Sequence, residues 1–177
     1  KQAQATLEQL ARYEEYITAW MISGPYTKGR ADAAALFDIP FPPEKDGGKQ
    51  ATWRLIPAGT NRDHPYLIEL HRVFPGSERV AYLRGSVWSE NGQNARMEIG
   101  SDDGVKVWLN GEAVHANNVI RANAPNEDKV NVSLKKGWNR ILVKVTQGSG
   151  EWSFCLRFCT PEGGKLEGLR AEPGDAS

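Results

Sequence analysis

The sequence predicts a mainly β protein: an antiparallel β-sandwich of the jelly-roll type with one N-terminal α-helix. From residue 52 onward, the chain is a succession of short segments in which apolar and polar residues alternate. Turn signals that contain Gly or Asn separate these segments at nearly regular intervals. Short strands with such spacing are typical of antiparallel sandwiches and barrels. Only residues 3–17 show a clear helical period.

The run of residues 100–111 shows the strand-and-turn pattern most clearly. Asp-Asp-Gly at 102–104 is a turn signal, because Asp closes turns with its own side chain and Gly supplies positive φ. Residues 105–109 then alternate, so that one face of this strand is apolar and the other is mixed. Asn110 and Gly111 predict a type I′ hairpin, which needs φ > 0 at both central positions. The run therefore predicts a β-meander at the centre of the chain.

The first fifty residues hold the predicted helix. Apolar residues recur at i, i+3 and i+4 over 3–17, so we expect residues 1–17 to be a linker helix from a neighbouring domain. A strand is expected at 17–22, where a following Gly-Pro pair ends it. Residues 27–50 contain several Pro and Gly and are expected to be irregular, with a helical turn or two at 31–37.

Residues 18–160 are expected to form the sandwich module, and 161–177 a tail that is disordered over 172–177. The expected strands are 52–57, 66–70, 79–89, 94–100, 105–110, 112–115, 129–134, 139–146 and 151–159. Alternation within these strands predicts the residues that face the core together: Ile141, Val143 and Val145; Trp152, Phe154, Leu156 and Phe158; and Met97 and Ile99 with Val105, Val107 and Leu109.

The two cysteines, Cys155 and Cys159, are expected to be half-buried free thiols. In a regular strand they lie on the same side, at roughly 13 Å from one another. That separation is too large for a disulfide, so the pair could be bridged only if the chain bends after Phe158.

Composition excludes several classes of protein. Lys plus Arg and Asp plus Glu both number 22, so the formal net charge is zero and no basic field attracts nucleic acid. No apolar stretch approaches the roughly 18–20 residues needed to span a bilayer, and we expect no membrane span. Residues 1–3 have the character of a mature or excised N-terminus rather than of a signal peptide.

No catalytic constellation stands out. The histidines at 64, 71 and 115 are scattered, and the sequence contains no nucleophile elbow, P-loop or dinucleotide-binding motif. A hydrolase acting on polysaccharide stays an alternative, because glycosidase carboxylates are defined by a spatial separation that sequence does not reveal.

Calcium is the one candidate cofactor. Glu98, Asp102 and Asp103 could present oxygen ligands to Ca²⁺, which takes six to eight oxygens from clustered carboxylates and carbonyls. The alternative is that Asp102 and Asp103 only close the hairpin turn.

Six tryptophans in 177 residues are the second indication of function. Indole rings offer a large flat apolar area on which the C–H faces of sugars can stack. Core packing is the alternative for each Trp individually. The candidate ligand contacts, which lie near the central hairpins, are Trp88, Trp108, Asn110 and His115.

Three stretches, 20–26 (WMISGPY), 100–111 (GSDDGVKVWLNG) and 134–145 (LKKGWNRILVKV), together resemble a galactose-binding-like jelly-roll module. Such modules accompany large secreted or periplasmic bacterial proteins, including glycoside hydrolases and multidomain cytochromes. The pattern is also similar to the sugar-binding sandwich domains of glycoside hydrolase family 2 and, more distantly, to the PA14 module. The resemblance covers about residues 17–159, and its motifs are mostly structural turns.

The resemblance implies a non-catalytic carbohydrate-binding accessory module of a larger extracytoplasmic protein. The expected partners are a polysaccharide or oligosaccharide and the neighbouring domains of the parent chain, in a secreted, periplasmic or cell-surface location. A structural or protein-interaction domain without a sugar ligand is the main alternative, since the N-terminal helix and the neutral charge fit it equally well.

Overall fold

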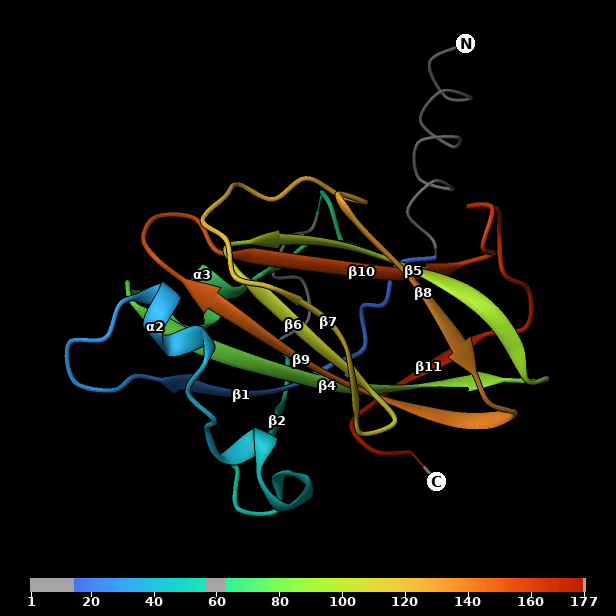
Figure 1. Cartoon of the computed structure of the whole chain (residues 1–177), viewed down its shortest axis with the longest axis horizontal. Helices are drawn as coiled ribbons and strands as arrows, with labels where there is room; N and C mark the ends of the chain where they lie inside the picture. Colours follow the sequence, from blue (N-terminus) through green and yellow to red (C-terminus); the bar gives the residue numbers. More distant parts are fainter. Residues whose placement is uncertain (1–14, 57–62, 177) are drawn as a thin grey trace, which may run out of the picture.

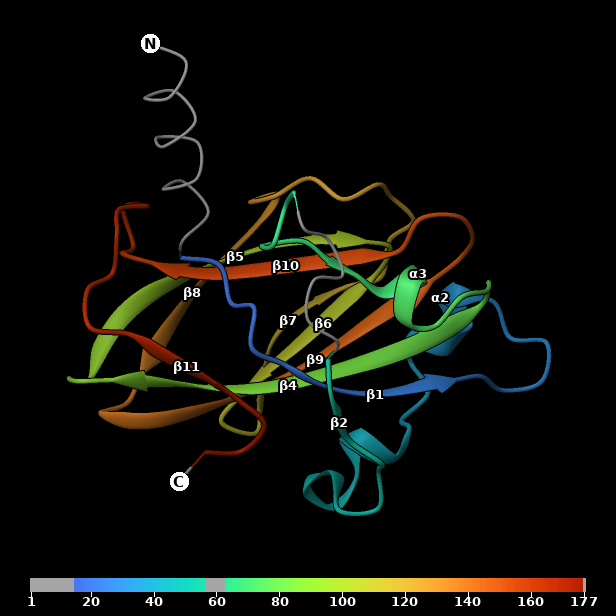
Figure 2. The same ribbon diagram turned by 180° about the vertical axis from the view of Figure 1, so that it is seen from behind.

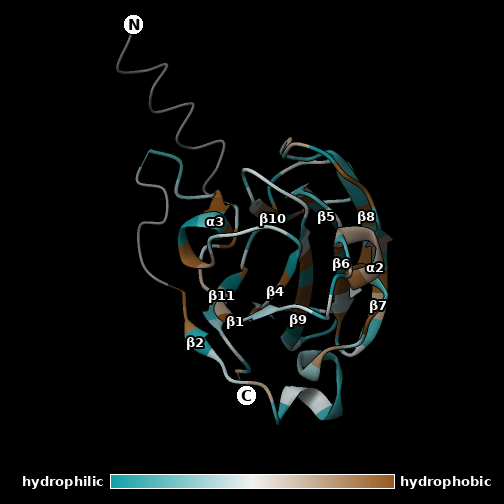
Figure 3. Cartoon of the chain, turned by 90° about the vertical axis from the view of Figure 1, so that its left-hand side faces the viewer, coloured by the Kyte–Doolittle hydropathy of each residue, from teal (hydrophilic) through white to brown (hydrophobic). Residues whose placement is uncertain are grey.

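The computed structural model describes residues 15–56 and 63–176, and these form two antiparallel β-sheets packed face to face (Figure 1). Figure 3 views the sandwich from one end, with β10, β5 and β8 in the upper layer and β1, β4 and β9 in the lower one. The predicted fold class, an antiparallel β-sandwich, is confirmed.

The larger sheet has seven strands in the order β2-β1-β4-β9-β6-β7, with β11 also paired to β4. Along one edge of β4, β1 pairs with its first half and β11 with its second half (Figure 2). The strands of this sheet are β1 (Met21–Tyr26), β2 (Arg54–Leu55), β4 (Arg79–Ser89), β6 (Val105–Leu109), β7 (Glu112–Asn117), β9 (Gly137–Gln147) and β11 (Arg170–Pro173).

The smaller sheet has four strands in the order β3-β10-β5-β8. Cys155 of β10 lies opposite Gly100 of β5, and Met97 of β5 lies opposite Val130 of β8. The strands are β3 (Ile68–Glu69), β5 (Gln93–Asp102), β8 (Asp128–Leu134) and β10 (Ser153–Cys159), and a short helix, α3 (Leu70–Val73), follows β3.

The core lies between the two sheets and follows the predicted alternation. Trp20 and Trp152 are fully buried there, and Trp20 meets Phe154 edge-on at 5.7 Å between ring centroids. The residues predicted to face inward are all buried: Met97, Ile99, Val105, Val107, Leu109, Ile141, Val143, Val145, Trp152, Phe154, Leu156 and Phe158.

A second, smaller apolar cluster lies on the outer face of the larger sheet. Three short helices cover this face: α2 (Ala33–Phe37), η1 (Pro42–Glu44) and η2 (Asp46–Gly48). Leu36 and Phe41 from this segment pack against Val80 and Tyr82 of β4. The helical turn predicted at 31–37 is confirmed as α2, whose N-cap Asp32 accepts a hydrogen bond from the backbone of Ala35.

The N-terminal prediction differs from the structure at its end. Residues 1–14 of the predicted helix lie outside the described residues. Tyr16 forms an isolated β-bridge with Arg157, and the backbone N–H of Ile17 donates to Leu156 at 2.9 Å. The helix therefore does not continue to residue 17, because strand pairing and core burial of Ile17 outweigh the local helical period. The strand predicted at 17–22 begins at Met21 and continues to Tyr26.

The C-terminal tail holds a strand that the sequence analysis missed. β11 pairs with β4, and Glu172 lies opposite Ser86. The hydroxyl of Ser86 donates to the carbonyl of Gly174 at 2.7 Å and accepts from the backbone of Ala176 at 3.1 Å. Residues 172–176, which were predicted to be disordered, are therefore held against the larger sheet. They pair there because β4 leaves a free edge beyond the end of β1.

Both cysteines are free thiols, as predicted. They are fully buried rather than half-buried. Within residues 15–56 and 63–176, no helix is long and apolar enough to cross a membrane.

Candidate functional site

A groove of about 590 Å³ lies on the outer face of the larger sheet, beside the segment that carries α2, η1 and η2. Its floor is formed by outward-facing residues of β4, β6 and β9. Because neighbouring residues of a strand point to opposite faces, Arg84, Trp108, Trp138, Arg140 and Leu142 all point away from the core. We call this feature the tryptophan groove.

Three other segments form the walls of the tryptophan groove. Glu44 and Trp53 lie on the side of the η1–η2 segment, and Gly111 marks the turn between β6 and β7. Asp175 and Ala176 come from the tail beyond β11. Strands and loops that are far apart in the sequence therefore meet at one depression.

Three half-buried indoles line the groove. The guanidinium of Arg84 stacks over Trp53 at 4.1 Å from the ring centroid, and the indole N–H of Trp53 donates to the carbonyl of Gly48 at 3.1 Å. The ammonium of Lys106 lies 5.1 Å from the ring centroid of Trp108. In the described part of the chain, no hydrogen bond engages the indole N–H of Trp108 or of Trp138.

Trp88 lies next to the groove rather than in its lining. It sits opposite Trp138 across the β4–β9 pair, and the two rings meet edge-to-face at 5.5 Å between centroids. The guanidinium of Arg170 lies 5.4 Å from the Trp88 centroid and 5.9 Å from that of Trp138. Trp88 thus supports one of the groove's rings from the side.

Some charged residues of the lining form ion pairs, and others do not. Arg84 is 3.7 Å from Asp175, and Glu44 is 2.9 Å from the ammonium of Lys144. Lys135 and Arg140 are exposed, and neither makes an ion pair with any described residue.

The Glu44–Lys144 pair anchors the wall of the groove. Lys144 has no exposed side-chain surface, and its ammonium also donates to the carbonyl of Ile39 at 2.7 Å. The hydroxyl of Tyr82 donates to the same carboxylate. Burial lowers the pKa of Lys144, and the neighbouring carboxylate of Glu44 opposes that shift. Burial, and then its hydrogen bond to Glu44, raise the pKa of Tyr82.

Among the predicted ligand contacts, the structure brings Trp108 and Asn110 together at the tryptophan groove. Asn110 occupies the predicted turn with a φ of 51°. Its side chain donates to Asn139 at 3.0 Å and accepts from the backbone of Arg140 at 2.9 Å. Asn110 therefore ties the β6–β7 turn to β9 and fixes the rim of the groove.

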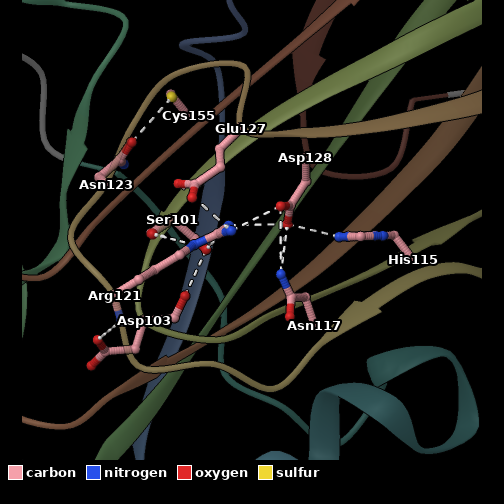
Figure 4. A network of polar contacts seen from close by, with 9 residues as sticks. All are labelled: Ser101, Asp103, His115, Asn117, Arg121, Asn123, Glu127, Asp128 and Cys155. Carbon is pink, nitrogen blue, oxygen red and sulfur yellow. Dashed lines mark hydrogen bonds and ion pairs between the residues drawn. The ribbon is translucent and has the colours of Figure 1, made fainter.

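His115, the fourth predicted contact, lies elsewhere, at the edge where β7 and β8 bring the two sheets together. Its Nε2 is 2.8 Å from Asp128, and the side-chain amide of Asn117 also donates to Asp128, at 3.3 Å. Figure 4 shows Asp128 at the centre of this cluster, with Arg121 on its other side.

Arg121 is the hub of a polar network that the sequence analysis missed. Its guanidinium makes two hydrogen bonds to Asp128, at 2.8 and 3.0 Å, and two to Ser101, at 3.1 and 2.9 Å (Figure 4). Burial alone raises the pKa of Asp128, but hydrogen bonds from Arg121, His115 and Asn117 outweigh burial and lower it to about 2. The network links β7 of the larger sheet to β5 and β8 of the smaller sheet.

The three predicted calcium ligands do not meet. Glu98 is buried in the smaller sheet, where the guanidinium of Arg157 donates to it at 2.7 Å. Asp103 accepts from the backbone of Arg121 at 2.9 Å and of Gly148 at 2.7 Å. Among the residues that the structure describes, no three His, Cys, Asp or Glu side chains are grouped as a metal site would require.

Asp102 differs from its neighbour in being less well partnered. Burial, followed by the charge of Asp103, raises the pKa of Asp102 to about 7. Asp103 instead connects the turn to Arg121 and Gly148, which is a different role from closing the hairpin turn.

A second depression, of about 610 Å³, opens between the β6–β7 hairpin and strands β5 and β8. Its polar lining consists mainly of uncharged side chains, among them Asn94, Asn131 and Ser133. Among the described residues, no aromatic side chain lines it, which distinguishes it from the tryptophan groove as a site for flat apolar ligands.

Trp53, Trp138, Arg84, Arg140 and Asp175 are groove residues that the sequence analysis did not select. Strand parity could have found some of them, because Trp138, Arg140 and Leu142 alternate with the predicted core residues of β9. Trp53 and Asp175 had no such signal, since loop and tail positions follow from tertiary packing.

No family model and no curated protein matches this sequence. Many solved structures are similar to this chain, and three of them illustrate the likeness. An anti-sigma factor domain-containing protein is 12% identical with a TM-score of 0.52, over 90% of this chain and 49% of that one. A β-glucosidase from Kluyveromyces marxianus, solved with glucose, is 13% identical with a TM-score of 0.51, over 80% and 16%.

The third structure is the A domain of epithelial adhesin 9 (Epa9A) from Candida glabrata, solved with Galβ1-3GlcNAc. It is 11% identical with a TM-score of 0.50, over 89% of this chain and 90% of that one. This chain thus spans about half the length of the first protein and about a sixth of the second. At these identities the likenesses show the fold.

Proposed function

We propose that this protein is a non-catalytic carbohydrate-binding domain that holds a saccharide in the tryptophan groove, as part of a larger extracytoplasmic protein. The observation that carries the proposal is the gathering of Trp53, Trp108 and Trp138 around one depression. A pyranose ring has an apolar face that stacks on indole and a rim of hydroxyls that need hydrogen-bond partners. Cationic and amide groups stand beside the rings to supply those partners.

Two fold relatives support the same ligand class. The adhesin domain was solved with a galactose-containing disaccharide, and the β-glucosidase with glucose. The adhesin domain is matched over 90% of its own length, so the likeness extends over nearly the whole of that saccharide-bound domain. A galactose-binding-like module of a secreted, periplasmic or cell-surface protein is the assignment that we favour.

Binding is a better assignment for this groove than hydrolysis. Glycoside hydrolysis uses two carboxyl groups, one to protonate the leaving group and the other as base or nucleophile. The groove's two carboxylates, Glu44 and Asp175, are each paired with a cation, Lys144 or Arg84. Both carboxylates of the described lining are thus engaged in ion pairs, and the lining holds no further carboxyl group that could act as acid, base or nucleophile beside them.

A glycan array followed by titration calorimetry tests the proposal. Wild-type protein is screened with Ca²⁺ and again with EDTA, and the best ligand is titrated into Trp108→Ala. We expect a loss of about 1–3 kcal/mol of binding free energy, the value of removing a stacked indole. Trp108→Phe, which keeps an aromatic ring, should retain part of that binding.

Ile120→Ala is the matched control, because Ile120 is 68% exposed and does not line the groove. Equal affinity of Trp108→Ala and wild type would reject the groove as the site. A protein that binds no glycan on a broad array would favour the protein-interaction alternative.

A further inference from the structure

We propose that the tryptophan groove selects an acidic saccharide, one that carries a carboxylate or a sulfate on the ring held against the indoles. This inference rests on the proposed function and names the ligand class for the same site. It follows from the charged side chains that line the groove and from which of these already have an ion-pair partner of opposite charge.

Five charged side chains of the described residues line the groove: Glu44, Arg84, Lys135, Arg140 and Asp175. Glu44 is the deepest of the anions, with 13% of its side chain exposed. It faces the fully buried ammonium of Lys144 and accepts a hydrogen bond from Tyr82. Its negative charge is therefore compensated from beneath the groove and does not repel an approaching anion.

Asp175 is compensated from within the groove by Arg84, at 3.7 Å. This contact is longer than a hydrogen bond, and the buried Nε of Arg84 has no partner among the described residues. The guanidinium, whose Cζ lies 4.1 Å from the Trp53 ring centroid, thus keeps unused donor capacity. The pair contributes no net charge to the groove.

Lys135 and Arg140 remain as uncompensated cations. Both are exposed, and no described side chain forms an ion pair with either. Arg140 lies two residues from Trp138 and two from Leu142, on the same outer face of β9, and Asn110 holds its backbone N–H. Its position is therefore fixed by the sheet, beside one of the indoles. Lys106, 5.1 Å from the Trp108 ring centroid, adds a further cation next to the lining.

The positive field is local, because the whole chain has a formal net charge of zero. A carboxylate or sulfate on a sugar stacked at the groove would meet Arg140, whose planar fork matches such groups with two parallel hydrogen bonds. A neutral sugar would leave these cations without a charged partner. Partial shielding of the ligand from water by the groove makes such charge-assisted bonds stronger than at an open surface.

Calorimetry with matched pairs of oligosaccharides tests the inference. The first pair is an oligogalacturonide and its methyl-esterified form, and the second is a carrageenan oligosaccharide and its chemically desulfated form. We expect each acidic member to bind at least tenfold more tightly than its neutral member, and this ratio to shrink as salt rises from 50 to 500 mM. The pair with the larger ratio of acidic to neutral affinity identifies the anionic group as carboxylate or sulfate.

Arg140→Gln should lower affinity for the acidic member about tenfold and leave the neutral member unchanged. Lys28→Gln removes an exposed lysine outside the groove and is the matched control. Equal affinity for acidic and neutral members, with both lost in Trp108→Ala, would overturn the inference and leave the proposed function in place. Absence of binding to every saccharide would overturn the proposed function itself. Acidic binding that survives in Arg140→Gln would also overturn the inference.

Discussion

The buried pair of Glu44 and Lys144 is the feature of the groove whose removal should have the largest measurable effect. Glu44→Gln keeps the size and one oxygen of the side chain but removes its charge. The ammonium of Lys144, which has no exposed side-chain surface, would then lose its ion-pair partner. It would keep neutral acceptors, chiefly the carbonyl of Ile39 and the faces of Phe41 and Tyr82, together with the weaker attraction of Asp38.

The expected cost is about 3 kcal/mol of the free energy of unfolding. Breaking a buried ion pair by removing one partner costs about 3–5 kcal/mol, because the other charge is left uncompensated. Glu44 retains some contact with water, and the Ile39 carbonyl still accepts from Lys144, so the lower end applies. Replacing both partners, as Glu44→Gln with Lys144→Met, should recover most of the loss, because it removes the charge that needs a partner.

Chemical denaturation at several pH values is the assay. Burial already lowers the pKa of Lys144, and loss of Glu44 lowers it further. Between that lowered pKa and the ordinary value near 10.5, the unfolded chain binds more protons than the folded one, so stability rises with pH. Glu44→Gln should therefore regain stability as the pH rises toward 10.5, more steeply than wild type. A loss below about 1 kcal/mol, or a flat pH profile for the variant, would refute this account of the anchor.

Three further predictions concern the rest of the molecule. The pKa of Asp128, lowered to about 2, should make wild-type stability fall as pH drops from about 4 to 2, and urea denaturation of Asp128→Asn over that range should show a shallower fall. Gly100→Ala should lower the free energy of unfolding by about 1–3 kcal/mol in thermal denaturation, because the added methyl would lie 2.8 Å from the carbonyl of Ala124. Gly92→Ala should be nearly neutral, because no atom lies nearer than 3.8 Å to the added methyl, and equal costs for the two variants would contradict the prediction. Burial raises the pKa of Cys155 to about 12, so the native protein at pH 8 should react with a thiol reagent far more slowly at this site than the denatured chain, and rapid native labelling of Cys155 would show that the smaller sheet opens.

The strands were predictable because their signal is local. The period of two over β4 to β6 and β9 to β10, with Gly and Asn at the turns, marks both the faces and the ends of the strands. β11 was not predictable in this way, because its four residues are exposed or half-buried and lack an apolar face. It forms because β4 extends beyond the end of β1 and leaves unpaired backbone groups after residue 84, with which β11 pairs.

The site was predictable only in part, for the same reason. Trp108 and Asn110 belong to the central hairpin, so the sequence motif that located the turn also located them. His115 is one strand away from Trp108, yet a bulge between Val107 and Trp108 shifts the β6–β7 register, and His115 reaches Asp128 of the other sheet. A one-residue change of register moves a side chain to the opposite face of the sheet, and the local sequence pattern does not predict this bulge.

The segment between β1 and β2 explains why a groove exists on this sheet at all. An outer sheet face is normally gently curved and open, and a few aromatic residues on it make only a flat patch. Here Phe41 and Leu36 secure the segment to Val80 and Tyr82, and the buried Lys144 ties it down through Glu44. The η1–η2 turns then stand beside Trp108 and Trp138 as a wall, and Trp53 at the segment's end closes the third side. The same buried pair thus serves stability and site shape, which is why loss of Glu44 should weaken saccharide binding as well as folding.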